Sequence, residues 1–344
     1  MKPNLLFEHL LAKLDLNAEQ MQQVIHACMS GQYNDLQIAT FLALMRMKGE
    51  TTNELTAAAQ VMQQLAHSID LGTNLIDIVG TGGDGKNTFN VSTACSFVVA
   101  AAGIPVAKHG NRSVSSRSGS ADLLEQAGFV LNLSDQHMQI CLQQCNLAFL
   151  FAPSYHPAMQ HARTARQQLG IRTLFNLLGP LINPARVKKQ VVGVFSTTWQ
   201  HSLASVLANL GSERALVVSS QDGLDEISIA APTQVVEYHQ GQFTEWMINP
   251  ADYAMHHPSL DEIIVDSPRQ SLTMIQSVFS GKPSAARDMV LLNSAAAIYC
   301  AQENSSFTQA LEHAKAAIDS GKAQQCFNQL RQLTQNLTKE SDHE

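Results

Sequence analysis

The glycine-rich segment Gly80-Thr-Gly-Gly-Asp84 constrains the fold of this chain more than any other feature. It follows the apolar run Leu75-Ile-Asp-Ile-Val79 and precedes Asn90-Val-Ser-Thr93, which opens a long apolar segment. This order predicts a strand, a tight turn and the start of a helix. Glycines let the backbone approach a phosphate closely, and the N–H groups and dipole of the helix start attract it. The segment predicts an anion site, although a turn before a capped helix that binds nothing has the same pattern.

The spacing of these glycines limits which phosphate ligands are expected. It matches neither G-x-x-x-x-G-K-[ST] nor G-x-G-x-x-G followed by an acidic residue on the next strand. An ordinary ATP or NAD is therefore not the expected ligand.

A second polar cluster spans residues 108–120 and follows the apolar run 93–106. It reads Lys108-His-Gly-Asn-Arg-Ser-Val-Ser-Ser-Arg-Ser-Gly-Ser120. Two strand-to-loop signals with a helix between them predict a right-handed βαβ crossover. Both loops then open at one sheet edge, where ligands bind in open α/β sheets. The Lys, Arg and Ser side chains suit a ligand with several phosphates, and a solvated surface loop is the alternative.

The third cluster, Asp222-Gly-Leu-Asp-Glu-Ile-Ser228, follows the strand-like run 214–220. Adjacent Asp225 and Glu226 at the end of a strand cannot both turn inward cheaply without a cation. Hard oxygen ligands beside a phosphorylated substrate indicate Mg²⁺, which takes only one or two carboxylates from a protein. A solvated acidic turn is the alternative reading.

The chain divides near Gly72 into a helical part and an alternating part. Before it, apolar residues recur at helical spacing, which predicts helices over 5–14, 18–29, 35–48 and 53–66, capped by Asn17, Asn34 and Thr52. After it, short β-branched runs alternate with helices, with strands expected over 76–79, 106–108, 149–151, 190–195, 215–218 and 234–238. We predict an α/β fold with a small all-helical domain and a larger α/β domain built on a mostly parallel sheet.

Bulk properties favour a cytoplasmic enzyme. The net charge of −7 over 344 residues argues against a nucleic-acid binder acting through its whole surface. We expect no signal peptide and no membrane-spanning segment, since the longest apolar stretch, around 94–107, is too short to cross a bilayer. Six scattered cysteines show no metal-ligand pattern and are expected to be free, packed thiols.

The three clusters, together with Arg172-Thr-Leu-Phe-Asn-Leu-Leu-Gly-Pro-Leu-Ile-Asn-Pro184, resemble the anthranilate phosphoribosyltransferases. These enzymes belong to a nucleoside phosphorylase and phosphoribosyltransferase-like group. The resemblance runs in the family's order from about residue 5 to the last third of the chain, and the second and third clusters are its specific part. It implies transfer of the 5-phosphoribosyl group from 5-phosphoribosyl 1-diphosphate to the amine of anthranilate, with release of pyrophosphate, in tryptophan biosynthesis.

The resemblance also implies which residues form the site. Catalytic roles fall to Lys108, Asp225 and Glu226. The metal ligands are Ser92, Asp225 and Glu226, around two Mg²⁺ ions. The acceptor anthranilate is expected at Gly80, Asn111 and Arg166. The diphosphate donor is expected at Gly80, Gly83, Asp84, Thr88, Asn90, Val91, Ser92, Thr93, Lys108, His109, Gly110, Asn111, Arg112, Ser113, Val114, Ser115, Ser116 and Ser120.

Two of these residues have competing interpretations, and one position of the loop departs from the family's pattern. Arg166 lies in a stretch that also reads as a helix with ordinary solvated arginines, although a planar guanidinium suits the anthranilate carboxylate. His109 could take the proton of the attacking amine, or be a structural histidine bonded to backbone, so we treat it as a contact and not as the base. In the family the loop usually reads Ser-Ser-Lys-Ser-Gly-Ser, whereas this chain has Arg117 at the Lys position, which leaves that contact open.

The resemblance implies that residues 164–185 rejoin the helical domain of residues 1–71, with 72–163 and 186–344 forming the donor-binding α/β domain. A homodimer joined through the helical domain is expected, with no nucleic-acid and no membrane partner. Two alternatives stay open: a pyrimidine nucleoside phosphorylase, which should lack the third cluster, and a non-enzymatic relative that binds nucleic acid.

Overall fold

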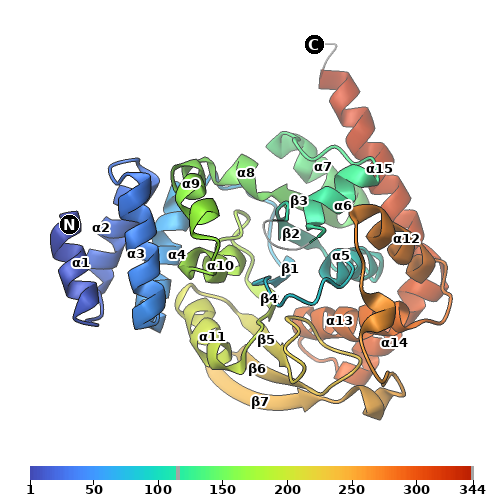
Figure 1. The fold of residues 1–344 in the computed structure, drawn as a ribbon. Helices are drawn as coiled ribbons and strands as arrows, with labels where there is room; N and C mark the ends of the chain where they lie inside the picture. The colour runs from blue at the N-terminus through green and yellow to red at the C-terminus, as the bar shows by residue number, and fades with distance from the viewer. Residues whose placement is uncertain (114–116, 342–344) are drawn as a thin grey trace.

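Within residues 1–113 and 117–341, which the computed structural model describes, seven strands form one sheet in the order β3-β2-β1-β4-β5-β6-β7 (Figure 1). Strands β1 to β5 pair in parallel, and β6 and β7 pair antiparallel to their neighbours. The prediction of a mostly parallel sheet is confirmed. The strands are β1 (Ile76–Gly80), β2 (Val106–Gly110), β3 (Leu147–Phe151), β4 (Lys189–Gly193), β5 (Arg214–Ser220), β6 (Thr233–His239) and β7 (Gln242–Ile248).

Strand β7 is the one strand of the described sheet that the sequence did not predict. It is an edge strand whose residues are mostly exposed, so it lacks the apolar run that marks the buried parallel strands. Gln240 and Gly241 join it to β6, and both have positive φ, of 50° and 81°. Two such residues form the hairpin turn that matches strand twist.

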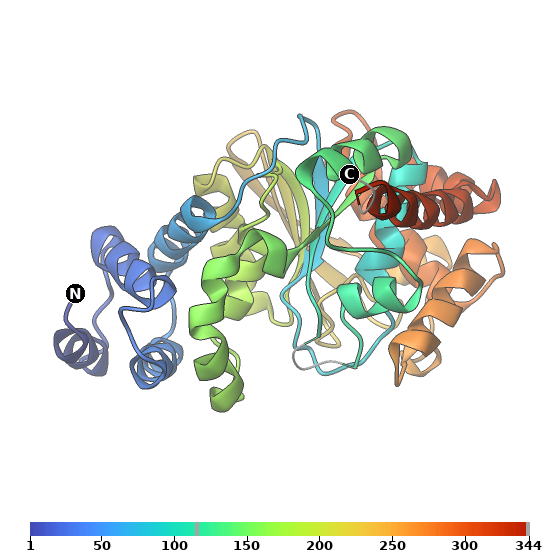
Figure 2. The ribbon, with the colours of Figure 1, turned by 90° about the horizontal axis from the view of Figure 1, so that it is seen from above.

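Helices cover both faces of the sheet (Figures 1 and 2). Side chains of β5 alternate between the two sides: Leu216 and Val218 join a core with α5 and α13, whereas Ala215 and Val217 join a core with α11 and the N-terminal helices. The helices after β1 are α5 (Val91–Ala101), α6 (Ser120–Gln126), α7 (Asp135–Cys145), α8 (Ala152–Tyr155), α9 (Gln160–Leu169), α10 (Leu174–Leu178), α11 (Gln200–Asn209), α12 (Pro268–Phe279), α13 (Ala285–Ala301), α14 (Phe307–Asp319) and α15 (Lys322–Ser341).

The N-terminal helices form a bundle beside the sheet: α1 (Pro3–Leu11), α2 (Ala18–Met29), α3 (Asp35–Lys48) and α4 (Thr52–Leu65). Asn17 and Asn34 cap α2 and α3 as predicted, each in a capping box. The predicted cap Thr52 is wrong, because Thr51 caps α4 and the Glu54 carboxylate accepts from the Thr51 N–H at 2.9 Å. Helix α9 packs on α2 and α3, and α10 packs on α4, although both come far later in the chain (Figure 2).

Among the described residues, no helix is both long and apolar enough to cross a membrane. The six cysteines are buried and free, as expected.

Candidate active site

The carboxyl ends of β1 and β4 carry the third cluster directly above them. The register pairs Gly80 with Gly193 at these ends, and Asp225 lies across both glycines. A β-carbon at Gly80 would lie 2.5 Å from Asp225 Oδ2, and one at Gly193 would overlap the Asp225 carbonyl oxygen. The missing side chains are what allow the acidic turn to approach the glycine turn after β1.

Three carboxylates meet at this point. Asp225 Oδ2 accepts from the Gly82 N–H at 2.7 Å, and the Asp84 carboxylate lies within hydrogen-bonding reach of the Asp225 carboxyl group. Burial, reinforced by Asp84, raises the pKa of Asp225 to about 7. Burial, reinforced by Asp225, raises the pKa of Glu226 to about 8, although the Ser92 N–H donates to it. The site therefore resists full ionisation without a cation.

The donor set fits Mg²⁺ held jointly by protein, water and substrate. Its members are hard oxygens, and burial raises the pKa values of Asp225 and Glu226 although Lys108 acts to lower that of Glu226. Within the described part of the chain, no group of three His, Cys, Asp or Glu side chains could hold a metal ion unaided.

Lys108 supplies a buried positive charge next to the acidic pair. Its Nζ donates to the Ile78 carbonyl at 2.6 Å and to Ser92 Oγ at 3.2 Å. Burial lowers the pKa of the ammonium group, whereas Asp77 and Glu226 act to raise it. These contacts fix the ammonium group beside Ser92, at the start of α5.

The glycine turn presents unused donors. In the described structure, the backbone N–H groups of Gly83, Asp84 and Gly85 make no hydrogen bond. The Thr81 hydroxyl is buried and also has no partner. Neighbouring free N–H groups of this kind form the concave anion site that the sequence predicts.

Asn90 holds the surrounding loops together. Its Oδ1 accepts from the Ser118 and Ser271 hydroxyls at 2.7 Å each, and its Nδ2 donates to the Ser118 carbonyl at 3.0 Å. Asn90 therefore ties the second cluster and α12 to the start of α5. Of its neighbours, Val91 is buried, and Thr88 bridges to Ile264.

The loop after β2 holds its two arginines in ion pairs. Arg112 contacts Glu125 at 2.5 Å and lies over the Phe151 ring, and Arg117 pairs with Asp266. The base of the loop is closed through Asp122, which accepts from the N–H groups of Ser113 and Gly119 at 2.8 and 2.9 Å, while the Ser120 hydroxyl donates to the Asn111 carbonyl at 3.2 Å. The predicted contacts Val114, Ser115 and Ser116 lie outside the described residues.

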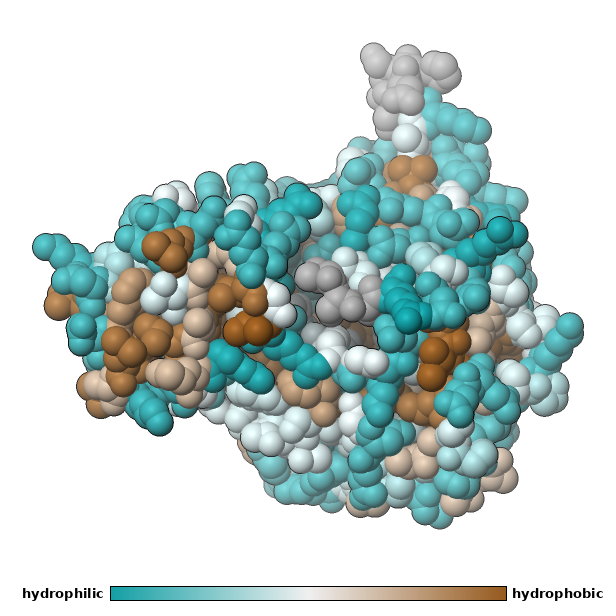
Figure 3. Space-filling view, viewed as in Figure 1, coloured by the Kyte–Doolittle hydropathy of each residue, from teal (hydrophilic) through white to brown (hydrophobic). Residues whose placement is uncertain are grey.

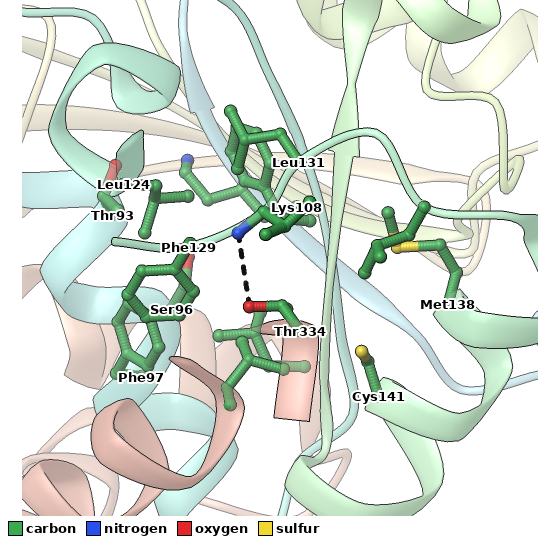
Figure 4. Close-up of a pocket in the computed structure, with 15 residues that line it drawn as sticks. Thr93, Ser96, Phe97, Lys108, Leu124, Phe129, Leu131, Met138, Cys141 and Thr334 are labelled. Carbon is green, nitrogen blue, oxygen red and sulfur yellow. Dashed lines mark hydrogen bonds between the residues drawn. The ribbon is translucent and has the colours of Figure 1, made fainter. Parts of the chain in front are cut away.

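A small cavity of about 20 Å³ lies inside the α/β part, where side chains of α5, α7 and α15 meet (Figure 4). Lys108 and Thr93 line it among mostly apolar side chains, and the Thr93 hydroxyl is buried without a partner. Such a volume suits about one water molecule. It is too small for either expected substrate, which leaves the sheet edge as the candidate site.

The segment of α9 and α10, which packs on the bundle, also reaches the loops of the α/β part. Arg166, on α9, is half-buried over the Phe175 ring at 5.5 Å, and burial lowers its pKa, which favours an anionic partner. His109 Nδ1 bonds the Gly179 carbonyl at 3.3 Å. Burial and the neighbouring His156 lower the pKa of His109 to about 3, so the ring is neutral at pH 7. Figure 3 shows the surface hollowed between the bundle and the α/β part.

Comparisons with known proteins agree with this geometry. A family model described as the helical bundle domain of a glycosyl transferase family matches residues 5–66, and the a/b domain of the same family matches 72–324. An anthranilate phosphoribosyltransferase of Legionella pneumophila strain Paris is 76% identical over 344 residues, covering 100% of both chains. This chain belongs to the anthranilate phosphoribosyltransferase family.

Two solved structures of the family have the same fold. The enzyme from Thermus thermophilus is 34% identical with a TM-score of 0.89, over 96% of this chain and 99% of that one. The enzyme from Saccharomyces cerevisiae, in complex with phosphoribosyl diphosphate and Mg, is 26% identical with a TM-score of 0.88, over 97% of this chain and 98% of that one.

Sequence reasoning missed a residue that positions the phosphoribosyltransferase loops. Asp77, buried in β1, accepts from the His109 N–H at 3.2 Å and from Asn183 Nδ2 at 2.8 Å. Asn183 also donates to the Ala107 carbonyl, and this bond fixes the chain after α10 against β2. An acidic residue inside an otherwise apolar strand was the available signal.

Proposed function

We propose that this chain transfers the 5-phosphoribosyl group of 5-phosphoribosyl 1-diphosphate to the amine of anthranilate, as a pentosyltransferase of tryptophan biosynthesis. The observation that carries the proposal is the meeting of Asp225 and Glu226 with the glycine turn, where free N–H groups and buried carboxylates lie side by side. An anion site next to a cation site is what a metal-bound diphosphate requires.

The donor lies along the glycine turn and the loop after β2. The N–H groups of Gly83 and Asp84 bind phosphate oxygens, and Lys108 contributes positive charge where pyrophosphate leaves. When bound, Mg²⁺ would neutralise the negative charge that grows on the leaving pyrophosphate. We infer two Mg²⁺ ions, with Ser92, Asp225 and Glu226 as their protein ligands. The remaining proposed donor contacts are Gly80, Thr88, Asn90, Val91, Thr93, His109, Gly110, Asn111, Arg112, Ser113, Val114, Ser115, Ser116 and Ser120.

The acceptor lies between Gly80, Asn111 and Arg166. The Arg166 guanidinium, which burial leaves short of solvent, forms a planar fork for the anthranilate carboxylate. Asn111 is exposed at the start of the loop, and its amide orients the acceptor. Gly80 brings Asp225 to this place, because its missing side chain leaves room for the Asp225 carboxylate, and its backbone would contact the acceptor from the end of β1.

The chemistry is a substitution in which the bond to pyrophosphate breaks early. The protein holds the amine and the anomeric carbon in line and stabilises the departing charge, so most of the rate enhancement is positional and electrostatic. No strong base is needed, because the aromatic amine is neutral at pH 7. His109 is neutral as well, and we keep it as a contact.

The helical domain would form the dimer contact and supply one side of the acceptor site. We infer a helical domain of residues 1–71 rejoined by about 164–185, which α9 and α10 support by packing on α2, α3 and α4. Exposed apolar side chains gather on the bundle (Figure 3), and they support a homodimer through this domain. They are Leu5, Leu11, Leu14, Leu36 and Met47. Six buried free thiols support action in the cytoplasm.

The test follows the loss of anthranilate fluorescence with purified protein, 5-phosphoribosyl 1-diphosphate and Mg²⁺. We expect loss that EDTA stops and that Asp225→Asn/Glu226→Gln abolishes. The control is Asp252→Asn, an exposed acidic residue outside the site, which should leave the rate unchanged. A folded, Mg²⁺-supplied protein that consumes no anthranilate refutes the proposal.

A further inference from the structure

Arg172 lies at the glycine turn without an assigned role. It comes from the short connection between α9 and α10, which pack on the bundle, yet its guanidinium lies against the turn after β1. A β-carbon built at Gly83 would lie 2.7 Å from Arg172 Nε and 3.3 Å from its Nη2. The side chain therefore spans from the helical side of the molecule to the proposed donor site.

The ring of Phe195 holds this guanidinium in place. Arg172 Cζ lies 3.8 Å from the centre of the Phe195 ring. Phe195 belongs to the connection that begins at the end of β4. Stacking fixes the plane of the guanidinium and leaves its N–H edges available, because it uses the face of the group and not its donors. The arginine is thus oriented before any ligand arrives.

The donors of Arg172 are unused. In the described part of the chain it makes no hydrogen bond and no ion pair, whereas Arg112 and Arg117 are each held by a carboxylate. The adjoining N–H groups of Gly83 and Asp84 have no hydrogen-bond partner there either. A fixed cation and free backbone donors at one place form a site for a multiply charged anion.

We propose that Arg172 is a further substrate-binding residue of the transferase, whose guanidinium binds a phosphate oxygen of the diphosphate donor next to the Gly83 backbone. The proposal rests on the proposed function for the identity of that anion. Arg172 and Arg166 lie in the same segment, which packs on the helical bundle. This segment would then contact both substrates, the donor through Arg172 and the acceptor through Arg166.

The experiment measures donor and acceptor KM values by anthranilate fluorescence and, separately, pyrophosphate binding by calorimetry with Mg²⁺. We expect Arg172→Gln to raise the donor KM and to weaken pyrophosphate binding by about 10-fold or more, the value of a hydrogen bond to a charged group. Arg172→Lys, which keeps the charge and loses the fork, should fall in between. The anthranilate KM should change less than twofold.

The matched control is Arg163→Gln, which removes an exposed arginine of the same segment and should change neither quantity. Phe195→Leu should weaken pyrophosphate binding less than Arg172→Gln does, because it removes the platform and keeps the charge. Unchanged pyrophosphate binding in a folded Arg172→Gln protein overturns the proposal, as does an equal rise of both KM values. Pyrophosphate binding remains a valid readout even if the wild-type protein uses another acceptor, so a failure of the proposed function is told apart from a failure of this role.

Discussion

Replacing the acidic pair should stabilise the metal-free protein while removing its activity. Burial raises the pKa of Asp225 from 3.8 to about 7 and that of Glu226 from 4.5 to about 8. Groups whose pKa is higher in the folded state bind protons more tightly there, so stability falls as pH rises from about 4 to about 8. Asp225→Asn/Glu226→Gln keeps the acceptors for the Gly82 and Ser92 N–H groups and removes this titration.

The magnitude follows from these pKa values. Each pH unit between the folded and unfolded pKa of a group is worth about 1.4 kcal/mol, so full ionisation of Asp225 costs the folded state about 4 kcal/mol. Water entering the site reduces the cost, and we expect the double variant to gain about 2 to 4 kcal/mol over the wild type at pH 8 in EDTA. Near pH 4 the gain should be close to zero, because the wild-type carboxyl groups are then protonated.

The assay is urea unfolding in EDTA at several pH values, repeated with Mg²⁺ and pyrophosphate. Ligands should stabilise the wild type and leave the double variant unchanged, since only ionised carboxylates hold the cation. A variant less stable than the wild type at pH 8, or a difference that does not depend on pH, would refute the reasoning.

Three further predictions test other parts of the site and of the assembly. Arg166→Ala should raise the KM for anthranilate about 10-fold or more and leave that for the diphosphate nearly unchanged, measured by fluorescence, and equal weakening would remove Arg166 from the acceptor site. Gly193→Ala should cost about 3 kcal/mol or more in urea unfolding because its β-carbon meets the Asp225 carbonyl oxygen, whereas Gly179→Ala, with open space around it, should cost less than about 1 kcal/mol. Leu36→Asp should halve the mass found by light scattering, and an unchanged mass would place the dimer contact elsewhere; the exposed Phe243→Asp is the control.

The fold could be predicted from sequence wherever local pattern and burial agree. The buried parallel strands and helices α2 and α3 match their predicted positions within a few residues, because continuous apolar runs and Asn caps mark them. Strand β7 was not predicted, because an exposed edge strand needs no apolar run. The cap of α4 was predicted at Thr52 and not at Thr51, because both residues offer the same hydroxyl group.

The site could be predicted only in part. The glycine, basic and acidic clusters can be recognised in the sequence by their composition. The predicted parallel sheet explains why they meet at one edge. The contribution of Arg172 depends on a contact with Phe195 and Gly83, residues that are far apart in the chain. The raised pKa of Asp225 likewise comes from burial across two glycines, which no local pattern encodes.

The central claim is that one donor site joins the glycine turn to the acidic pair. The most direct test is a crystal structure with 5-phosphoribosyl 1-diphosphate and Mn²⁺ in place of Mg²⁺, read from the anomalous signal of the metal. The account predicts a metal peak in contact with Asp225 or Glu226 and the diphosphate along Gly83 and Asp84. A metal peak away from these carboxylates, with the diphosphate bound elsewhere, would contradict it.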